Sequence, residues 1–149
     1  MTYDDCGAGL LKFQRVCQMR KVVFVGHCGA DSSYLRIAVA SAGAAVSIVS
    51  VDDEESFAAA LESGAELVLI NRILDWGFPE EEGVALISRL RGTHPNLKTM
   101  LVSNYSESQQ AAVAAGALPG FGKREIGTAK VKELLRNALG EAVPSAKAV

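Results

Sequence analysis

The residues of this chain that are best placed for chemistry each follow a short segment with the pattern of a buried strand. They are His27, Asn71, Ser103 and Lys123. A lysine, a hydroxyl and a carboxylate can together accept and stabilise a transferred phosphoryl group, with acidic oxygens holding a divalent cation. In this sequence the segment 67–70 ends in the amide of Asn71, which cannot take up a phosphoryl group. These four positions therefore supply a lysine and a hydroxyl, but no carboxylate.

Cys28 permits two other kinds of chemistry. With the neighbouring His27 it could begin a soft-metal site, but no matching pair of ligands follows at a spacing that suits zinc. Before a helix it could instead be a thiolate nucleophile beside a bound anion, as in a small enzyme or phosphocarrier. No arginine stands at the spacing that a cysteine phosphatase needs. The simplest interpretation is a turn, in which Asp31 or Ser32 caps the next helix.

Strand-like and helix-like segments alternate from residue 21 onward, which is typical of a parallel sheet covered by helices on both faces. We expect strands over 21–25, 45–50, 66–70, 98–102 and 119–122, and helices over 32–42, 54–63, 81–91, 107–115 and 128–139. The predicted fold class is α/β, a flavodoxin-like doubly wound sheet of five parallel strands with five helices. The carboxyl ends of such strands meet at one rim. The residues expected there are Gly26, His27, Cys28, Asn71, Ser103 and Lys123.

Landmarks over residues 21–139 resemble those of response regulator receiver domains. Gly26 and His27 follow the first strand, where a receiver carries its metal-binding acid pair. Asn71 stands at the phosphoacceptor position, while Ser103 and Lys123 match the hydroxyl residue and the buried lysine of that family. The spacing also agrees at Gly43, Gly116 and Ala117. The order and spacing of these landmarks together indicate the family, and the resemblance implies the strand order 2-1-3-4-5.

Compared with receivers, the site lacks all three carboxylates that would bind the cation and accept the phosphoryl group. Gly26 and His27 replace the acid pair, and Asn71 replaces the acceptor. Lys123 has thereby lost its carboxylate partners, so we expect backbone carbonyls or solvent to meet its charge, or the side chain to extend to the rim. Arg124 stands where receivers have a proline after a cis peptide bond, which affects the expected geometry of this loop. We therefore predict a degenerate phosphoacceptor pocket.

Two further departures from the receiver pattern concern the surroundings of the pocket. Gly120 occupies the position of the aromatic switch residue, so we expect aromatic switching to be lost. The segment between Asn71 and Gly83 is four residues longer than in receivers, since the two lie twelve rather than eight positions apart. In this loop Trp76 and Phe78 could form a lid, although packing on neighbouring helices is the simpler prediction. Asp75 could return one carboxylate to the site.

Size, composition and charge set limits on the kind of protein. The chain has 149 residues, enough for one domain with an ordinary core. A net charge of -2 indicates no nucleic-acid partner and no anionic membrane surface. No segment approaches the roughly 20 apolar residues of a membrane helix. The three cysteines, Cys6, Cys17 and Cys28, fit reduced thiols, so we expect a cytoplasmic protein.

The domain organisation is predicted from the same landmarks. Residues 1–18 share no periodicity with the rest, and Met19 stands two residues before the first strand. We interpret this segment as an N-terminal arm or as upstream sequence from a mis-assigned start. Residues 19–140 form the receiver-like domain, and residues 141–149 form a C-terminal tail.

The function expected from these features is that of an atypical single-domain receiver, a phosphorylation-independent protein-binding module in signal transduction. We expect no enzymatic activity, no cofactor and no metal. The predicted partner is a signalling protein (a kinase, a receiver or an output protein) or a second copy of the chain. Residues 108–122 carry no charge, so we predict partner binding through Gln110, Ala114 and Phe121. The alternatives are a small enzyme or phosphocarrier using Cys28, or a metal- or ligand-sensing domain using His27 and Cys28.

Overall fold

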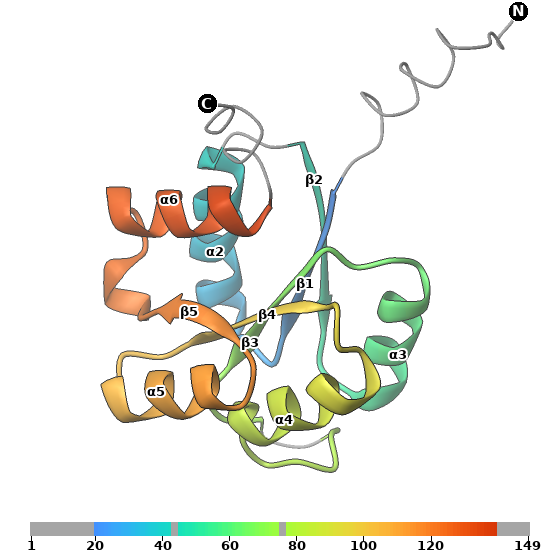
Figure 1. Ribbon diagram of the computed structural model, residues 1–149. Helices are drawn as coiled ribbons and strands as arrows, with labels where there is room; N and C mark the ends of the chain where they lie inside the picture. The colour runs from blue at the N-terminus through green and yellow to red at the C-terminus, as the bar shows by residue number, and fades with distance from the viewer. Residues whose placement is uncertain (1–19, 43–44, 75–76, 140–149) are drawn as a thin grey trace, which may run out of the picture.

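Five parallel strands form the centre of the structure, in the order β2-β1-β3-β4-β5 (Figure 1). The computed structural model describes residues 20–42, 45–74 and 77–139. Its elements, in chain order, are β1 Arg20–Val25, α2 Gly29–Ser41, β2 Val46–Val51, α3 Glu54–Glu62, β3 Leu67–Asn71, α4 Gly83–Thr93, β4 Lys98–Val102, α5 Ser106–Ala114, β5 Leu118–Phe121, the 3-10 helix η1 Lys123–Glu125, and α6 Ala129–Ala138. The described ranges therefore confirm the predicted doubly wound sheet of five strands with five α-helices.

The central strands are continuous apolar runs because both of their faces are buried. The last four side chains of β1 and the first four of β3 are fully buried, and successive side chains alternate between two hydrophobic cores. Phe24 and Leu69 belong to one core, and Val25 and Ile70 belong to the other. This burial fixes the register of the sheet and hence the height at which each strand ends.

Helices cover the sheet in two layers (Figure 1). On one face, α2 and α6 bury an apolar stripe that includes Leu35, Val39 and Leu135. On the other face, α3, α4 and α5 bury Phe57, Leu86 and Ala112, among others. The strands run parallel, so their carboxyl ends share one rim between these layers. Within the described ranges, no helix has the length and apolar character needed to cross a membrane.

Candidate functional site

A pocket of about 580 Å³ opens at the carboxyl rim of the sheet. Most of the predicted site residues meet there, because the parallel strands β1, β3, β4 and β5 all end at this rim. The pocket is lined by Gly26, His27, Cys28, Gly29, Asp31, Asp52, Asn71, Leu74, Phe78 and Lys123. Ser103 lies in an adjoining, smaller hollow that shares Asn71 and Lys123 with the main pocket. The two hollows thus bring together the residues expected at the rim, along with Asp31, Asp52, Leu74 and Phe78, which were not expected there.

The Asn71 side chain acts as a hydrogen-bond donor. Its Nδ2 group donates to the carbonyl oxygens of Gly26 and Ile73, both at 3.1 Å. Carbonyl oxygens only accept hydrogen bonds, so the amide nitrogen must face them, and a carboxylate could make neither bond. The amide therefore ties the loop after β3 to the end of β1. Asn71 is a structural component of the pocket, and its residue type suits these two acceptors.

Gly26 stands where receivers carry the first residue of the acid pair, and its backbone conformation favours glycine. Its φ angle is +74°, in the region that other residues rarely adopt. A Cβ atom at this position would also lie 2.9 Å from Cδ2 of Leu74, whose side chain is buried. An acidic side chain at Gly26 would therefore need both backbone rearrangement and displacement of Leu74.

His27 fills the second acid position and points into the protein. The residue is only 9% exposed, and its ring packs edge-on against Phe24. Nε2 donates to the carbonyl oxygen of Leu69 at 2.9 Å, which places the proton of the neutral ring on Nε2. Burial lowers the pKa of His27 to about 4, with a further contribution from the charge of Lys123, and the Leu69 hydrogen bond offsets this in part. At neutral pH this position contributes an uncharged imidazole.

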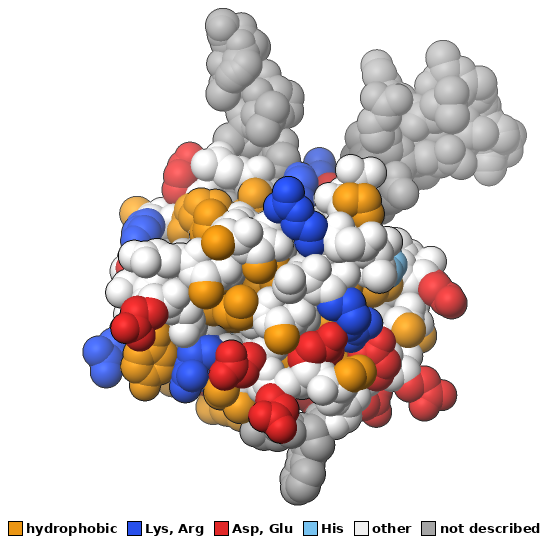
Figure 2. All heavy atoms as spheres, turned by 60° about the horizontal axis from the view of Figure 1, so that its bottom comes forward, with side chains coloured by type: hydrophobic (Ala, Val, Ile, Leu, Met, Phe, Trp, Pro, Cys, Tyr) orange, Lys and Arg blue, Asp and Glu red, His pale blue; other side chains and the backbone are white. Residues whose placement is uncertain are grey.

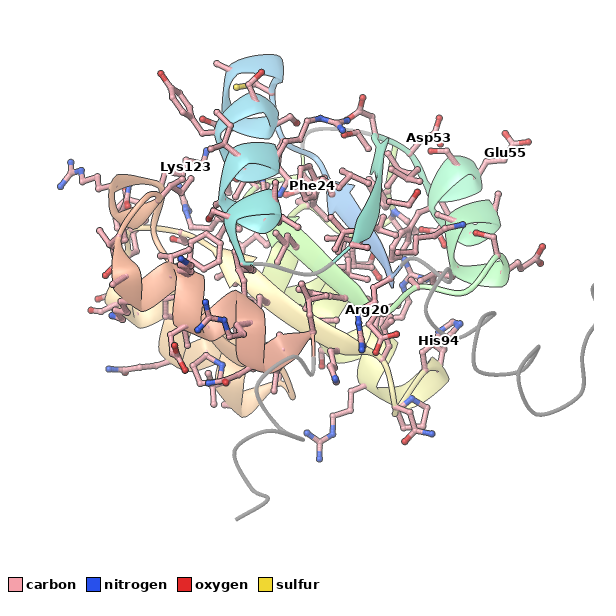
Figure 3. All side chains as sticks on the ribbon, turned by 90° about the horizontal axis from the view of Figure 1, so that it is seen from above. Arg20, Phe24, Asp53, Glu55, His94 and Lys123 are labelled. Atoms are coloured by element: carbon pink, nitrogen blue, oxygen red, sulfur yellow. The ribbon has the colours of Figure 1, made fainter. Side chains whose placement is uncertain are left out.

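Lys123 pairs with a carboxylate that comes from another part of the chain than in receivers. Its Nζ lies 2.6 Å from Oδ2 of Asp31, in the first turn of α2. Figure 3 shows Lys123 beside α2. The hydrogen bond from Lys123 lowers the pKa of Asp31, so this carboxyl group is ionised at neutral pH. We expected backbone carbonyl groups or solvent to balance the charge of Lys123, or its side chain to extend to the rim. The ion pair with Asp31 shows that this expectation is wrong.

The cap of α2 also differs from the prediction. Cys28 is the N-cap residue, and its Sγ accepts a hydrogen bond from the backbone N–H of Asp31 at 3.5 Å. Asp31 and Ser32 lie inside the helix instead of capping it. Because the sulfur occupies the cap, the carboxylate of Asp31 is free to turn toward Lys123.

The β4 and β5 side of the rim is held by backbone contacts. Ser103 is buried, and its Oγ accepts a hydrogen bond from the N–H of Tyr105 at 3.1 Å. Asn104 Oδ1 accepts from the N–H of Arg124 at 3.1 Å. The peptide bond before Arg124 is trans, and the chain enters the short helix η1 at Lys123. The serine hydroxyl and the turn after β5 thus serve the local backbone.

A magnesium ion, which the receiver resemblance implies, does not fit this rim. Mg²⁺ requires hard oxygen ligands in near-octahedral geometry, usually with one or two carboxylates. The Asp31 carboxylate is paired with Lys123, and His27 presents a neutral nitrogen. Across residues 20–42, 45–74 and 77–139, no three side chains of His, Cys, Asp or Glu gather closely enough to hold a metal ion. This set of donors therefore does not fit a magnesium ion.

The enlarged loop after β3 is fastened to its neighbours. Phe78 packs edge-on against Phe57 of α3, with ring centroids 5.9 Å apart, as the simpler prediction held. Arg89 of α4 binds both Glu80 of the loop, at 2.5 Å, and Glu54 of α3, at 2.7 Å. The predictions for Asp75 and Trp76 lie outside the described residues.

The predicted partner surface is accessible only in part. Gln110 and Ala114 of α5 are exposed, and Figure 2 shows hydrophobic side chains scattered among uncharged ones over the middle of the face formed by α4 and α5. Phe121 is only 1% exposed and belongs to the core under α2 and α6. Its prediction as a partner-binding residue is therefore wrong, because inward-facing strand residues at this edge are covered by helices.

Gly120, which precedes Phe121, leaves no room for an aromatic side chain at the switch position. A Cβ atom at Gly120 would lie 2.1 Å from the carbonyl oxygen of Leu101 and 2.8 Å from Oε1 of Gln109. Gln109 also donates from Nε2 to the carbonyl oxygens of Leu101, Ser103 and Phe121, at 2.9, 3.0 and 3.2 Å. This glutamine clamp, which the sequence did not reveal, joins α5 to β4 and β5.

No protein-family model and no curated protein matches the sequence, but the fold has solved counterparts. NtrX from Brucella abortus is similar at 18% identity with a TM-score of 0.66, covering 88% of this chain and 29% of that chain. The signal receiver domain of an HD domain-containing protein from Pseudomonas fluorescens Pf-5 is similar at 16% identity with a TM-score of 0.67, covering 90% and 96%. The non-phosphorylated receiver domain of the stress response regulator RcsB from Escherichia coli is similar at 15% identity with a TM-score of 0.65, covering 83% and 96%.

These similarities agree with the strand order and with the position of the rim. The chain spans less than a third of the NtrX chain and nearly the full length of the two isolated receiver domains. At 15% to 18% identity the comparison establishes the fold alone. The chemistry of the rim follows from its own residues. The chain has the flavodoxin-like receiver fold, and its neighbours among these solved structures are response regulator receiver domains.

Proposed function

We propose that this chain is a pseudo-receiver, a signal-transduction module that binds another protein without being phosphorylated and without catalysing a reaction. The observation that carries the proposal is the Asn71 amide, which donates to the carbonyl oxygens of Gly26 and Ile73. A receiver needs a free carboxylate at this point. In this chain Asn71 stands at that point, and its amide group donates hydrogen bonds to two backbone carbonyl oxygens. The position therefore serves the structure of the pocket.

The electrostatics of the pocket support the same proposal. In a receiver the lysine is available to the incoming phosphoryl group. In this chain Lys123 is held by Asp31 at 2.6 Å, and the imidazole of His27 is neutral and buried. An incoming phosphoryl group would meet a lysine that is already paired with a carboxylate. The rim therefore offers little stabilisation to the transition state of phosphoryl transfer.

The surface of α5 supports binding of a partner protein. Exposed positions of this helix include Gln110, Ala111, Val113 and Ala114, and Val113 is 46% exposed. Low charge with exposed apolar groups is typical of a protein interface. The partner classes that fit are those predicted from the sequence: a kinase, a receiver or an output protein of a signalling pathway.

The test compares capture of partners by two forms of the same bait. The full chain is immobilised with and without prior incubation with acetyl phosphate and magnesium, and bound proteins from a lysate of the source organism are identified by mass spectrometry. We expect the same partner in equal amounts from both forms. Replacing Gln110 and Ala114 with glutamate should lower capture, whereas Ala129→Glu, on exposed α6 surface, should not. Capture only after acetyl phosphate treatment would contradict the proposal.

The alternative function, a small enzyme or phosphocarrier using Cys28, rests on one observation. Cys28 is exposed, caps α2 and lines the pocket. An activated thiolate reacts with alkylating reagents much faster than an ordinary exposed thiol. Iodoacetamide labelling of the native chain, followed by peptide mapping, therefore separates the two functions. Labelling of Cys28 at the rate of an ordinary exposed cysteine supports the pseudo-receiver.

A further inference from the structure

Strand β2 forms one edge of the sheet, and its outer side is open in the described part of the chain. The N–H of Arg20 donates to the carbonyl of Ala45 at 3.0 Å, and that of Gly26 donates to Val51 at 3.1 Å. Odd-numbered residues of this strand therefore turn their backbone groups toward β1. A parallel strand presents these groups alternately to its two sides. Val46, Ile48 and Ser50 consequently present their N–H and C=O groups away from the sheet.

The two edges of this sheet differ in how they are protected. Strand β5, at the far edge, has only four residues, contains Pro119 and pairs with β4 through a register shift. Short length, proline and irregularity are the usual means by which proteins prevent edge pairing. Strand β2 has six residues, Val46–Val51, with neither a charge nor a proline, and all of them are valine, isoleucine or serine. Figure 3 shows β2 between α2 and α3. This edge carries none of those protections.

We propose that β2 is the interface of a symmetric homodimer, in which the β2 strands of two copies pair in antiparallel orientation. The result is one continuous sheet of ten strands, five from each copy. A two-fold axis is the simplest closed symmetry and requires this orientation. The proposal is independent of the pseudo-receiver function, which was argued from the carboxyl rim and from α5. Strand β2 forms the edge of the sheet opposite β5.

The backbone directions determine the register of this pairing. A hydrogen-bonded antiparallel pair needs an outward-facing residue on both strands. The register that uses all three such residues places Ile48 on the two-fold axis, opposite Ile48 of the second copy. Val46 then lies opposite Ser50, and Ser47 lies opposite Val49. Each serine meets a valine of the second copy, so small and branched side chains alternate across the seam.

A second copy of the chain fits this edge electrostatically. In the described part of the chain, Arg36 is a charged side chain that contacts the strand, since its Nη2 donates to Oγ of Ser50 at 3.4 Å. In the proposed register the two copies of Ser50 lie four residues apart along the seam, roughly 13 Å. This separation exceeds the screening length of about 8 Å at physiological ionic strength. The two arginines therefore do not oppose the pairing.

Sedimentation equilibrium of the full chain tests the proposal. We expect a dimer of twice the 15.7 kDa chain mass at high micromolar concentration. Ser50→Lys should weaken the dimer at least about tenfold, because a lysine on the edge opposes strand addition. Ser50 is exposed, so the monomer should keep its fold. The matched control is Ser88→Lys, the same change at an exposed position of α4, which should leave the dimer unchanged.

Hydrogen exchange identifies what occupies the edge. In the dimer the amides of Val46, Ile48 and Ser50 should exchange more slowly as protein concentration rises, and Ser50→Lys should abolish this dependence. A chain that stays monomeric at high micromolar concentration contradicts the proposal. Slow exchange at these amides in a monomer would assign the edge to another segment of the same chain, which also overturns it. A dimer weakened by Gln110→Glu but unaffected by Ser50→Lys would place the interface on α5 instead.

Discussion

Replacing Asn71 with aspartate restores the phosphoacceptor residue type, yet it should destabilise this protein. The amide donates to two carbonyl oxygens, those of Gly26 and Ile73. A carboxylate at the same position makes neither bond and brings a negative charge against both acceptors. Asn71→Asp is therefore expected to loosen the attachment of the β3 loop to the end of β1.

The expected magnitude follows from the two bonds. Each hydrogen bond in a partly buried site contributes about 0.5–1.5 kcal/mol, so their loss should lower the free energy of unfolding by about 1–3 kcal/mol at pH 7. The pKa of the new carboxyl group should be raised by the two carbonyl oxygens. A raised folded-state pKa favours the protonated form in the native state, so the destabilisation is greatest at neutral pH. It should shrink as the pH falls through that raised pKa, where the protonated carboxyl can again donate one hydrogen bond.

Urea unfolding at pH 7 and near pH 4 measures this effect. The matched control is Asn104→Asp, because Asn104 uses its side-chain oxygen, which an aspartate keeps, to accept from the N–H of Arg124. We expect the control to change stability by less than about 0.5 kcal/mol at pH 7. Equal stability of Asn71→Asp and wild type at pH 7 would refute the assignment of the amide as a structural donor.

Three further outcomes follow from the site. Asp31→Asn should cost up to about 1 kcal/mol in urea unfolding at pH 7. Because Lys123 holds the folded-state pKa of Asp31 below its ordinary value of 3.8, this cost should disappear as the pH falls through the lowered pKa, and a constant cost would argue against the ion pair. Arg89→Met should lower the unfolding free energy by about 1–2 kcal/mol and speed hydrogen exchange in the loop before α4; unchanged exchange would show that the loop is held by other contacts. In an NMR titration, His27 should stay neutral from pH 8 down to about pH 5, since burial lowers its pKa to about 4, whereas a midpoint near 6.5 would contradict its burial.

The fold was predictable because apolar segments mark its buried strands and because the spacing of its glycines is typical of the fold. Parallel strands buried on both faces read as apolar runs, as in the segments of β1 and β3, and strand-like segments alternated with helix-like ones along the chain. The positions after these strands therefore predicted the rim, and Asn71, His27 and Lys123 do meet there. Gly120 likewise predicted the loss of the aromatic switch, since no side chain fits at that position.

The contacts within the rim were not predictable from strand-end positions. Asp31 or Ser32 was expected as the helix cap, because both residue types are favoured at N-caps, but the sulfur of Cys28 caps α2 and the Asp31 carboxylate pairs with Lys123. That choice depends on how the start of α2 lies relative to Lys123 after β5, which a sequence pattern does not contain. Phe121 was assigned to a surface from the low charge of its segment, although the same lack of charge marks a buried strand. Charge alone does not separate these two environments.

The central claim, that this rim does not accept a phosphoryl group, is tested most directly by intact-mass spectrometry of the full chain after incubation with acetyl phosphate and magnesium. We predict no phosphoryl adduct on the wild-type chain. Asn71→Asp alone should also remain essentially unlabelled, because Gly26 and His27 still supply no cation ligands and Asp31 still neutralises Lys123. A stoichiometric adduct on the wild-type chain that is stable in acid and released by hydroxylamine would contradict the account.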